Sequence, residues 1–275
     1  MTDYLQYKFE DTAEFINTFD ELPLWSASFG LLLLKHLELK PNLVVLDIGS
    51  GAGFPLLELA QRLGTSCKCF GIDPWVNANS RAKQKIRNYD VTNVEVIEAS
   101  AEHLPFDTGS VDLIVSNLGI NNFDNPALVF KECNRALKPG GKLALTTNVN
   151  GHWREFYIIF EETLLQLGKT ELIPLLKNDE EHRGSIESIS NLFTDNGFGI
   201  NRHFEDQFEM KFLDGTAFLN HSFIKLGWLG AWKDIVPEAE QESIFSQLEE
   251  NLNAYAEKMG GLALTVPMAF IEGVK

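Results

Sequence analysis

The chain has 275 residues, of which 44% are hydrophobic, and its 39 acidic against 23 basic side chains give a formal net charge of −16. This length and apolar content predict a compact globular protein with one large core, or one core and an elaborated lobe. The acidity argues against nucleic acid as a partner, because phosphate binding relies on clustered lysine and arginine.

Targeting and metal-binding signals are missing from the sequence. No apolar run approaches the roughly 18 residues that a membrane span needs, and the acidic N-terminus does not resemble a signal peptide, so we expect a cytoplasmic protein. Cys67, Cys69 and Cys133 have no accompanying cysteine or histidine pair at zinc-site spacing, so we expect reduced thiols and no metal site.

The first elements in chain order are helices and a buried strand. Residues 1–42 predict an N-terminal helical cover whose leucine-rich helix stops near Lys40 and Pro41. Residues 43–48 form an apolar run typical of a parallel strand buried on both faces. Apolar residues at helical spacing from Phe54 to Leu63 then predict a helix.

The same alternation of strands and helices continues to residue 147. We predict strands at 67–72, 94–97, 111–116 and 142–147, helices at 79–88 and after Asn125-Pro126, and a turn at 138–141. A helix at 186–194, a strand from 198 to 204 or beyond, and a last strand at 262–271 follow. The fold class is therefore α/β, a doubly wound sheet of βαβ units.

Two aromatic-rich segments interrupt this alternation and define the expected organisation. We predict an N-terminal cover at 1–42, a core at 43–148, a cap insertion at 149–184, a core helix and strand at 185–206, a helical cap insertion at 207–260 and a final core strand at 261–275. The two insertions leave the sheet near strand ends and are interpreted as a substrate cap.

The stretch VLDIGSGAGFP, residues 45–55, has the strand, loop and helix pattern of a mononucleotide-binding unit. Its glycines permit a sharp turn and a close approach of backbone to ligand. A dinucleotide fingerprint would need glycine where Phe54 stands, and a P-loop would need a lysine that is not there. The remaining pattern is D-x-G-x-G-x-G.

Five motifs in order give this chain a resemblance to the class I S-adenosylmethionine-dependent methyltransferases, in the type 11 branch that includes the ubiquinone and menaquinone methyltransferases. They are LDIGSGAGFP, GIDPW, EASAEHLPF, DLIVSNLGINNF and LKPGGKLALTT. The resemblance implies a mostly parallel seven-stranded Rossmann-like sheet with a helical cap. It also implies S-adenosylmethionine as cofactor and S-adenosylhomocysteine as product.

The resemblance also implies roles for individual residues. Asp47 and the loop of Gly49, Gly51 and Gly53 would pack against the amino-acid end of the cofactor, with Asp47 near its ammonium group. Asp73 would accept hydrogen bonds from both ribose hydroxyls, a charge-assisted contact.

The remaining cofactor contacts implied by the family come from three later loops. Pro74 and Trp75 would flank the ribose and adenine. Ser100 stands where the family commonly has aspartate, so adenine recognition would lean on Ala101 and Glu102 and on apolar stacking. Asn117, Leu118 and Gly119 would line the cleft beside the methionine part.

Catalytic and substrate residues are harder to choose from sequence. His152 and His221 are the candidate general bases, because both stand in segments expected near the carboxyl ends of the strands. The candidate acceptor-binding aromatics are Trp25, Trp153, Tyr157, Phe218 and Trp228. Aromatics at helical spacing are more often core residues, and this alternative stays open.

The function predicted from sequence is methyl transfer to a small-molecule acceptor, with an apolar or aromatic acceptor favoured. A non-catalytic protein that binds S-adenosylmethionine or S-adenosylhomocysteine is the alternative. An NAD-dependent oxidoreductase is disfavoured by Phe54. The partner is thus a small molecule, and both a monomer and a homodimer fit the sequence.

Overall fold

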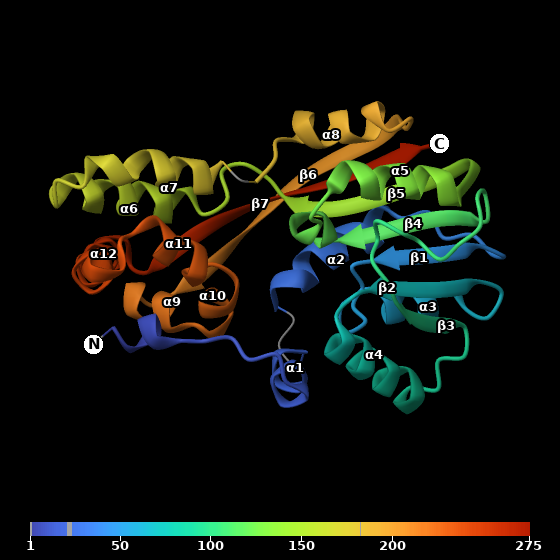
Figure 1. Ribbon diagram of the computed structural model, residues 1–275, viewed down its shortest axis with the longest axis horizontal. Coiled ribbons are helices and arrows are strands. Elements are labelled where there is room, and N and C mark those ends of the chain that lie inside the picture. The colour runs from blue at the N-terminus through green and yellow to red at the C-terminus, as the bar shows by residue number, and fades with distance from the viewer. Residues whose placement is uncertain (1, 21–23, 182) are drawn as a thin grey trace. The chain divides into compact units, whose positions relative to one another are not determined.

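A computed structural model describes residues 2–20, 24–181 and 183–275 of the chain (Figure 1). The chain divides into two compact units. The sheet unit comprises Glu10–Asn148, Ser185–Asp206 and Met268–Lys275. The helical unit comprises Met1–Phe9, Val149–Gly184 and Gln207–Pro267. Residues 1–42, predicted as one cover, thus contribute to both units.

The predicted seven-stranded, mostly parallel sheet is confirmed. Its strand order is β3-β2-β1-β4-β5-β7-β6, with parallel pairing from β3 through β5 and antiparallel pairing of β5 with β7. The strands are β1 (Val44–Ile48), β2 (Lys68–Asp73), β3 (Val94–Glu98), β4 (Val111–Asn117), β5 (Leu137–Asn148), β6 (Gly199–Phe212) and β7 (Leu262–Val274). The order reverses direction beside β1, where doubly wound sheets bind ligands.

Helices alternate with most strands of the sheet unit along the chain, as the sequence pattern predicts. They are α1 (Ala13–Asp20), α2 (Leu24–His36), α3 (Leu56–Leu63), α4 (Val76–Asn88), α5 (Pro126–Ala136) and α8 (Ile186–Asp195). The Asn125 side chain accepts from the Leu128 N–H and begins α5, with Pro126 in its first turn. Gly64 ends α3 with a positive φ of 70°.

The predicted turn at 138–141 is wrong, because these residues lie within β5. The register with β4 moves from Val111 opposite Leu137 to Leu113 opposite Lys142, which makes a bulge. The end of the chain holds this bulge: the Gly140 N–H donates to the Lys275 carbonyl and the Lys275 N–H to the Gly141 carbonyl, both at 3.0 Å. Pairing with the distant Lys275 thus outweighs the local preference of these residues for a turn.

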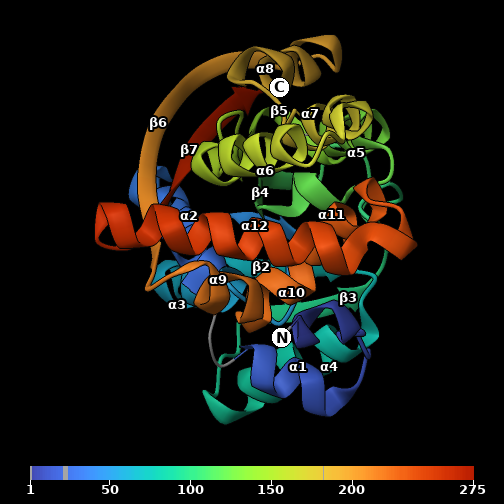
Figure 2. The same ribbon diagram turned by 90° about the vertical axis from the view of Figure 1, so that its left-hand side faces the viewer.

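The helical unit has an aromatic core. Its helices are α6 (Arg154–Gln166), α7 (Ile173–Glu180), α9 (Gly215–Asn220), α10 (Ser222–Gly227), α11 (Leu229–Ile235) and α12 (Glu238–Met259), with the 3₁₀ turns η1 (Asp3–Gln6) and η3 (Thr170–Leu172). Trp153, Phe156, Phe218 and Trp232 are completely buried. The long α12 packs against α6 and α9 (Figure 2).

Candidate functional site

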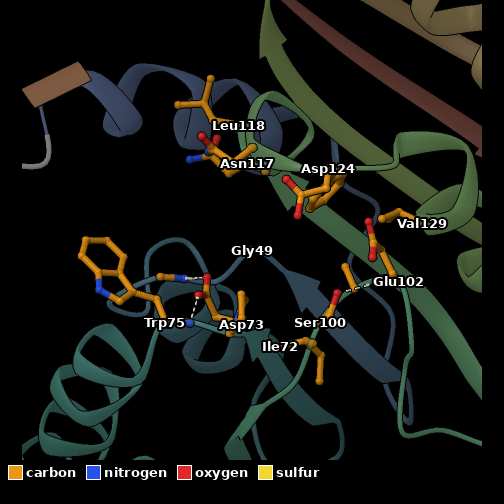
Figure 3. Close-up of a pocket in the computed structure, with 16 residues that line it drawn as sticks. Gly49, Ile72, Asp73, Trp75, Ser100, Glu102, Asn117, Leu118, Asp124 and Val129 are labelled. Carbon is orange, nitrogen blue, oxygen red and sulfur yellow. Dashed lines mark hydrogen bonds between the residues drawn. The ribbon is translucent and has the colours of Figure 1, made fainter. Parts of the chain in front are cut away.

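A pocket of about 440 Å³ lies in the sheet unit at the carboxyl ends of its parallel strands (Figure 3). Its lining comprises Gly49, Gly51, Ile72, Asp73, Pro74, Trp75, Ser100, Ala101, Glu102, Asn117, Leu118, Gly119, Asn122, Phe123, Asp124 and Val129. Eleven of the thirteen residues that the sequence predicts around the cofactor are among them.

Backbone approaches backbone at the floor of this pocket. Gly49 has a φ of +73°, and a Cβ there would lie 3.1 Å from the Cα of Gly119. A Cβ on Gly119 would lie 2.4 Å from the Ser116 Oγ and 2.9 Å from the Ile48 carbonyl oxygen. The loops after β1 and β4 therefore meet at two glycines, because a side chain at either position would collide with the protein.

Asp73 ends β2 and faces the pocket with a carboxylate that organises the loops around it. Its Oδ2 accepts from the Gly51 N–H and its Oδ1 from the Trp75 N–H, each at 2.8 Å. Burial raises the pKa of Asp73, and these two backbone hydrogen bonds act against that rise. Each carboxylate oxygen retains a further lone pair for a ligand hydroxyl.

Ser100 and Glu102 lie on the loop after β3, and β3 pairs with β2, the strand that ends at Asp73. The Ser100 Oγ accepts from the Glu102 N–H at 3.2 Å, so its own hydrogen can be donated to a ligand. The Glu102 Oε1 accepts from the Asn125 N–H at 2.9 Å, which ties this loop to the start of α5. Figure 3 shows Asp73 and Ser100 on one side of the pocket, with Asn117 and Leu118 opposite.

Asn117 is braced from two elements before the chain turns at Leu118. Its Oδ1 accepts from the Thr146 Oγ at 2.8 Å and its Nδ2 donates to the Ser26 carbonyl at 3.1 Å. Leu118 has a left-handed φ of 67°, which turns the chain into the short 3₁₀ helix η2 (Gly119–Asn122). This turn brings Phe123 and Asp124 to the pocket.

Two of the residues predicted around the cofactor lie away from the pocket. Asp47 is completely buried, and burial is the main cause that raises its pKa, with the nearby Asp73 adding to the rise. Gly53 lines a separate cavity of about 480 Å³, beside Asp20, Arg81 and Lys85. Both residues belong to the strand and loop that carry Gly49 and Gly51.

Sequence reasoning missed five residues of the lining, namely Ile72, Asn122, Phe123, Asp124 and Val129. Their signal in the sequence is position: Ile72 precedes Asp73, and the others lie within thirteen residues after the fourth strand. Asp124 is exposed and has its carboxylate at the pocket rim, so it adds to the negative charge of Asp73 and Glu102 (Figure 3).

The two candidate bases lie in the helical unit in different surroundings. His152 is 2% exposed and stacks on Trp153 with ring centroids 4.3 Å apart. Burial, with a smaller contribution from Arg183, holds the pKa of His152 well below its usual value, so the ring is neutral at pH 7. His221 is exposed and begins α10, its Nδ1 accepting from the Phe223 N–H at 3.3 Å.

Four of the five candidate acceptor-binding aromatics lie in the core of the helical unit. Trp153 packs against Trp228, with centroids 4.6 Å apart, and against Phe218 at 5.6 Å. The Tyr157 hydroxyl donates to the Asp179 Oδ2 at 2.8 Å. Trp25 belongs to the sheet unit, where it is half-buried in α2 and contacts Phe29 at 5.1 Å.

No group of three or more histidine, cysteine, aspartate or glutamate side chains in ranges 2–20, 24–181 and 183–275 is arranged to hold a metal ion. Within the same ranges, none of the helices combines the length and apolar character that crossing a bilayer demands.

Known proteins resemble this chain in the region of the pocket. Residues 46–145 match a family described as a methyltransferase domain. A demethylmenaquinone methyltransferase of Lactococcus lactis is 27% identical over 68% of this chain and 77% of its own length. An arsenite methyltransferase of Halobacterium salinarum is 35% identical over 38% of this chain, which spans only 27% of that protein.

Solved structures extend the likeness to the fold. An S-adenosylmethionine-dependent methyltransferase from Aquifex aeolicus superimposes with a TM-score of 0.54 at 22% identity. The match covers 71% of this chain and 92% of that one.

Proposed function

We propose, from the premise that this chain is a class I S-adenosylmethionine-dependent methyltransferase, that it methylates a small apolar or aromatic acceptor. The observation that carries the cofactor part is the convergence of eleven predicted residues on one pocket of the sheet unit. The acceptor part rests on the demethylmenaquinone methyltransferase among the relatives.

The pocket fits S-adenosylmethionine in charge and shape. Asp73, Glu102 and Asp124 give it a negative field that suits a ligand carrying a sulfonium and an ammonium group. Gly49, Gly51 and Gly119 line the pocket without a side chain that would fill it, which leaves room for the amino-acid end of the cofactor. When bound, the cofactor supplies a methyl group already activated by its positive sulfur.

We assign roles to the lining on these grounds. Asp73 accepts from the ribose hydroxyls, Pro74 and Trp75 flank the ribose and adenine, and Ser100 with Ala101 and Glu102 recognises the adenine edge. Asn117, Leu118 and Gly119 line the methionine side. Asp47 and Gly53 do not line the pocket, so we assign them no contact with the cofactor. The protein then contributes mainly alignment and exclusion of water.

The acceptor is proposed to resemble the aromatic ring that the name demethylmenaquinone methyltransferase implies, rather than arsenite. Trivalent arsenic prefers soft thiolate ligands. Cys67, Cys69 and Cys133 are all buried. Burial raises the pKa of Cys69 to about 12 and raises that of Cys133 further, so neither is a thiolate at neutral pH. Trp153, Tyr157, Phe218 and Trp228 are buried in the core of the helical unit, so the choice of an aromatic acceptor rests on the relatives.

Ligand analysis tests the cofactor assignment directly. We expect mass spectrometry of the denatured protein, and calorimetric titration, to show S-adenosylhomocysteine binding and no NAD binding. Binding of NAD alone would overturn the proposal. Transfer of labelled methyl to a demethylated naphthoquinol, with none to arsenite, is the expected acceptor result. A protein that binds the cofactor and methylates no acceptor would instead be the non-catalytic alternative.

The pH dependence of turnover tests His152 as the base. A base must be unprotonated, so its activity is lost as pH falls through its pKa, and the pKa of His152 lies well below its usual 6.5. We therefore expect kcat to stay constant from about pH 8 down to about pH 6.5. A protonation step inside that window would point to a group other than the two histidines, because burial and the nearby Lys225 lower the pKa of His221 as well.

A further inference from the structure

The glycine loop is held at its tip by a lysine that lies outside the cofactor pocket. The Ala52 carbonyl accepts from the Lys85 Nζ at 2.8 Å, one residue after the Gly51 N–H that donates to Asp73. Because a peptide unit is planar, fixing this carbonyl also fixes the direction of the Gly53 N–H. Asp73 from β2 and Lys85 from α4 thus form hydrogen bonds with the successive loop residues Gly51 and Ala52.

Lys85 reaches the loop without being part of its ligand-binding face. It belongs to the last turn of α4 and lines the separate cavity beside Gly53. The pocket lining does not include it. Lys85 therefore does not contact a ligand in the pocket, and its hydrogen bond to Ala52 is its direct contact with the glycine loop.

Asp20, the last residue of α1, holds the Lys85 ammonium group in place by an ion pair. One oxygen of its carboxylate pairs with the Lys85 ammonium, and the other accepts from the Arg81 Nε at 2.8 Å. The Asp20 side chain is only 7% exposed, so solvent screens this pair little. A lysine stem loses much rotamer freedom when it is held in one place, and the carboxylate compensates for that loss.

The other end of α1 is also fixed, near the pocket. Asp11 accepts from the Trp75 Nε1 at 2.8 Å and from the Asn77 Nδ2 at 3.0 Å. Helix α1 consequently lies along α4, as both views show (Figures 1 and 2). Asp20 is thus presented to Lys85 by a helix that is anchored at both ends.

We propose that Lys85 is a positioning residue for the methyl donor, which acts through the Ala52 carbonyl and is itself oriented by Asp20. This inference rests on the proposed cofactor site. A loop that spends only a fraction of its time in the binding geometry raises the apparent Kd by the inverse of that fraction. Lys85 keeps that fraction near one by adding a charge-assisted hydrogen bond to the loop.

Substitution of Lys85 by methionine, K85M, tests the proposal, because it removes the donor and keeps the length of the stem. We expect the Kd for S-adenosylhomocysteine to rise about tenfold, as it would if a tenth of the loop remained competent. Hydrogen exchange of the backbone at residues 49–55 in the ligand-free protein should become faster. K85R, which retains a charged donor, should restore most of the affinity.

Lys83 offers a matched control on the same helix. It is exposed, and K83M makes the same change of charge and shape two residues away. We expect K83M to bind S-adenosylhomocysteine as the wild type does. Equal weakening by K83M and K85M would overturn the proposal, since it would show a general charge effect. An unchanged Kd in K85M would overturn it as well.

The variant D20N tests the link through Asp20. We expect D20N to weaken binding less than K85M does, and the double variant to bind as K85M does, because both changes act on one contact. Additive losses would show that Asp20 does not act through Lys85. If the wild type itself binds no S-adenosylhomocysteine, the proposed function fails. If the wild type binds and only K85M is without effect, the positioning role alone fails.

Discussion

Replacement of Asp73 by alanine is expected to weaken the binding of S-adenosylhomocysteine about 30-fold, equivalent to about 2 kcal/mol. Two losses combine in this number. The ribose hydroxyls lose a charged acceptor, and the Gly51 and Trp75 N–H groups lose the partner that each now has at 2.8 Å. Calorimetric titration of the purified variant measures the effect.

The variant D73N separates the loss of the charge from the loss of the hydrogen-bond acceptors. An amide has one acceptor oxygen and one donor group, so D73N can satisfy only one of the two backbone N–H groups. We expect its affinity to lie between those of D73A and the wild type. The control is D195A at the exposed end of α8, which makes the same charge change away from the pocket. Wild-type affinity in D73A would remove Asp73 from the site.

Most of the sheet could be predicted from the sequence because its strands are apolar runs bounded by turn residues. Strand β1 was expected at 43–48 and spans Val44–Ile48. Strand β6 was expected from 198 to at least 204 and continues to Phe212. The bulge in β5 could not be predicted, because Pro139, Gly140 and Gly141 are residue types typical of a turn. Only pairing with the chain end at Lys275 makes them part of a strand.

The pocket was predictable for a topological reason. Parallel strands bring their carboxyl ends to one edge, so Gly49, Asp73, Ser100 and Asn117 meet although they are far apart in sequence. The hydrogen bond from Lys85 to Ala52 was not predictable, because a lysine in the last turn of a helix has the same sequence signature whether it is solvated or paired. The burial of His152 among tryptophans likewise depends on tertiary packing that spacing alone does not reveal.

Trp232→Ala is expected to lower the free energy of unfolding by about 3–5 kcal/mol, the usual cost of truncating a large buried aromatic. Trp232 is completely buried, with its ring 4.1 Å from that of Phe156 and 5.8 Å from that of Phe218. Urea unfolding followed by circular dichroism measures the loss. The control L213A alters a side chain that is 81% exposed in the same unit, and should change stability by less than about 0.5 kcal/mol.

The same variant separates the two parts of the proposed function. Every residue that lines the cofactor pocket belongs to the sheet unit, whereas Trp232 belongs to the aromatic core of the helical unit. At a temperature where Trp232→Ala remains folded, we therefore expect an unchanged Kd for S-adenosylhomocysteine together with a reduced kcat for an aromatic acceptor. Loss of cofactor binding in the folded variant would contradict the assignment of that pocket to the sheet unit alone. Full turnover would show that the aromatic core stabilises the helical unit without taking part in acceptor recognition.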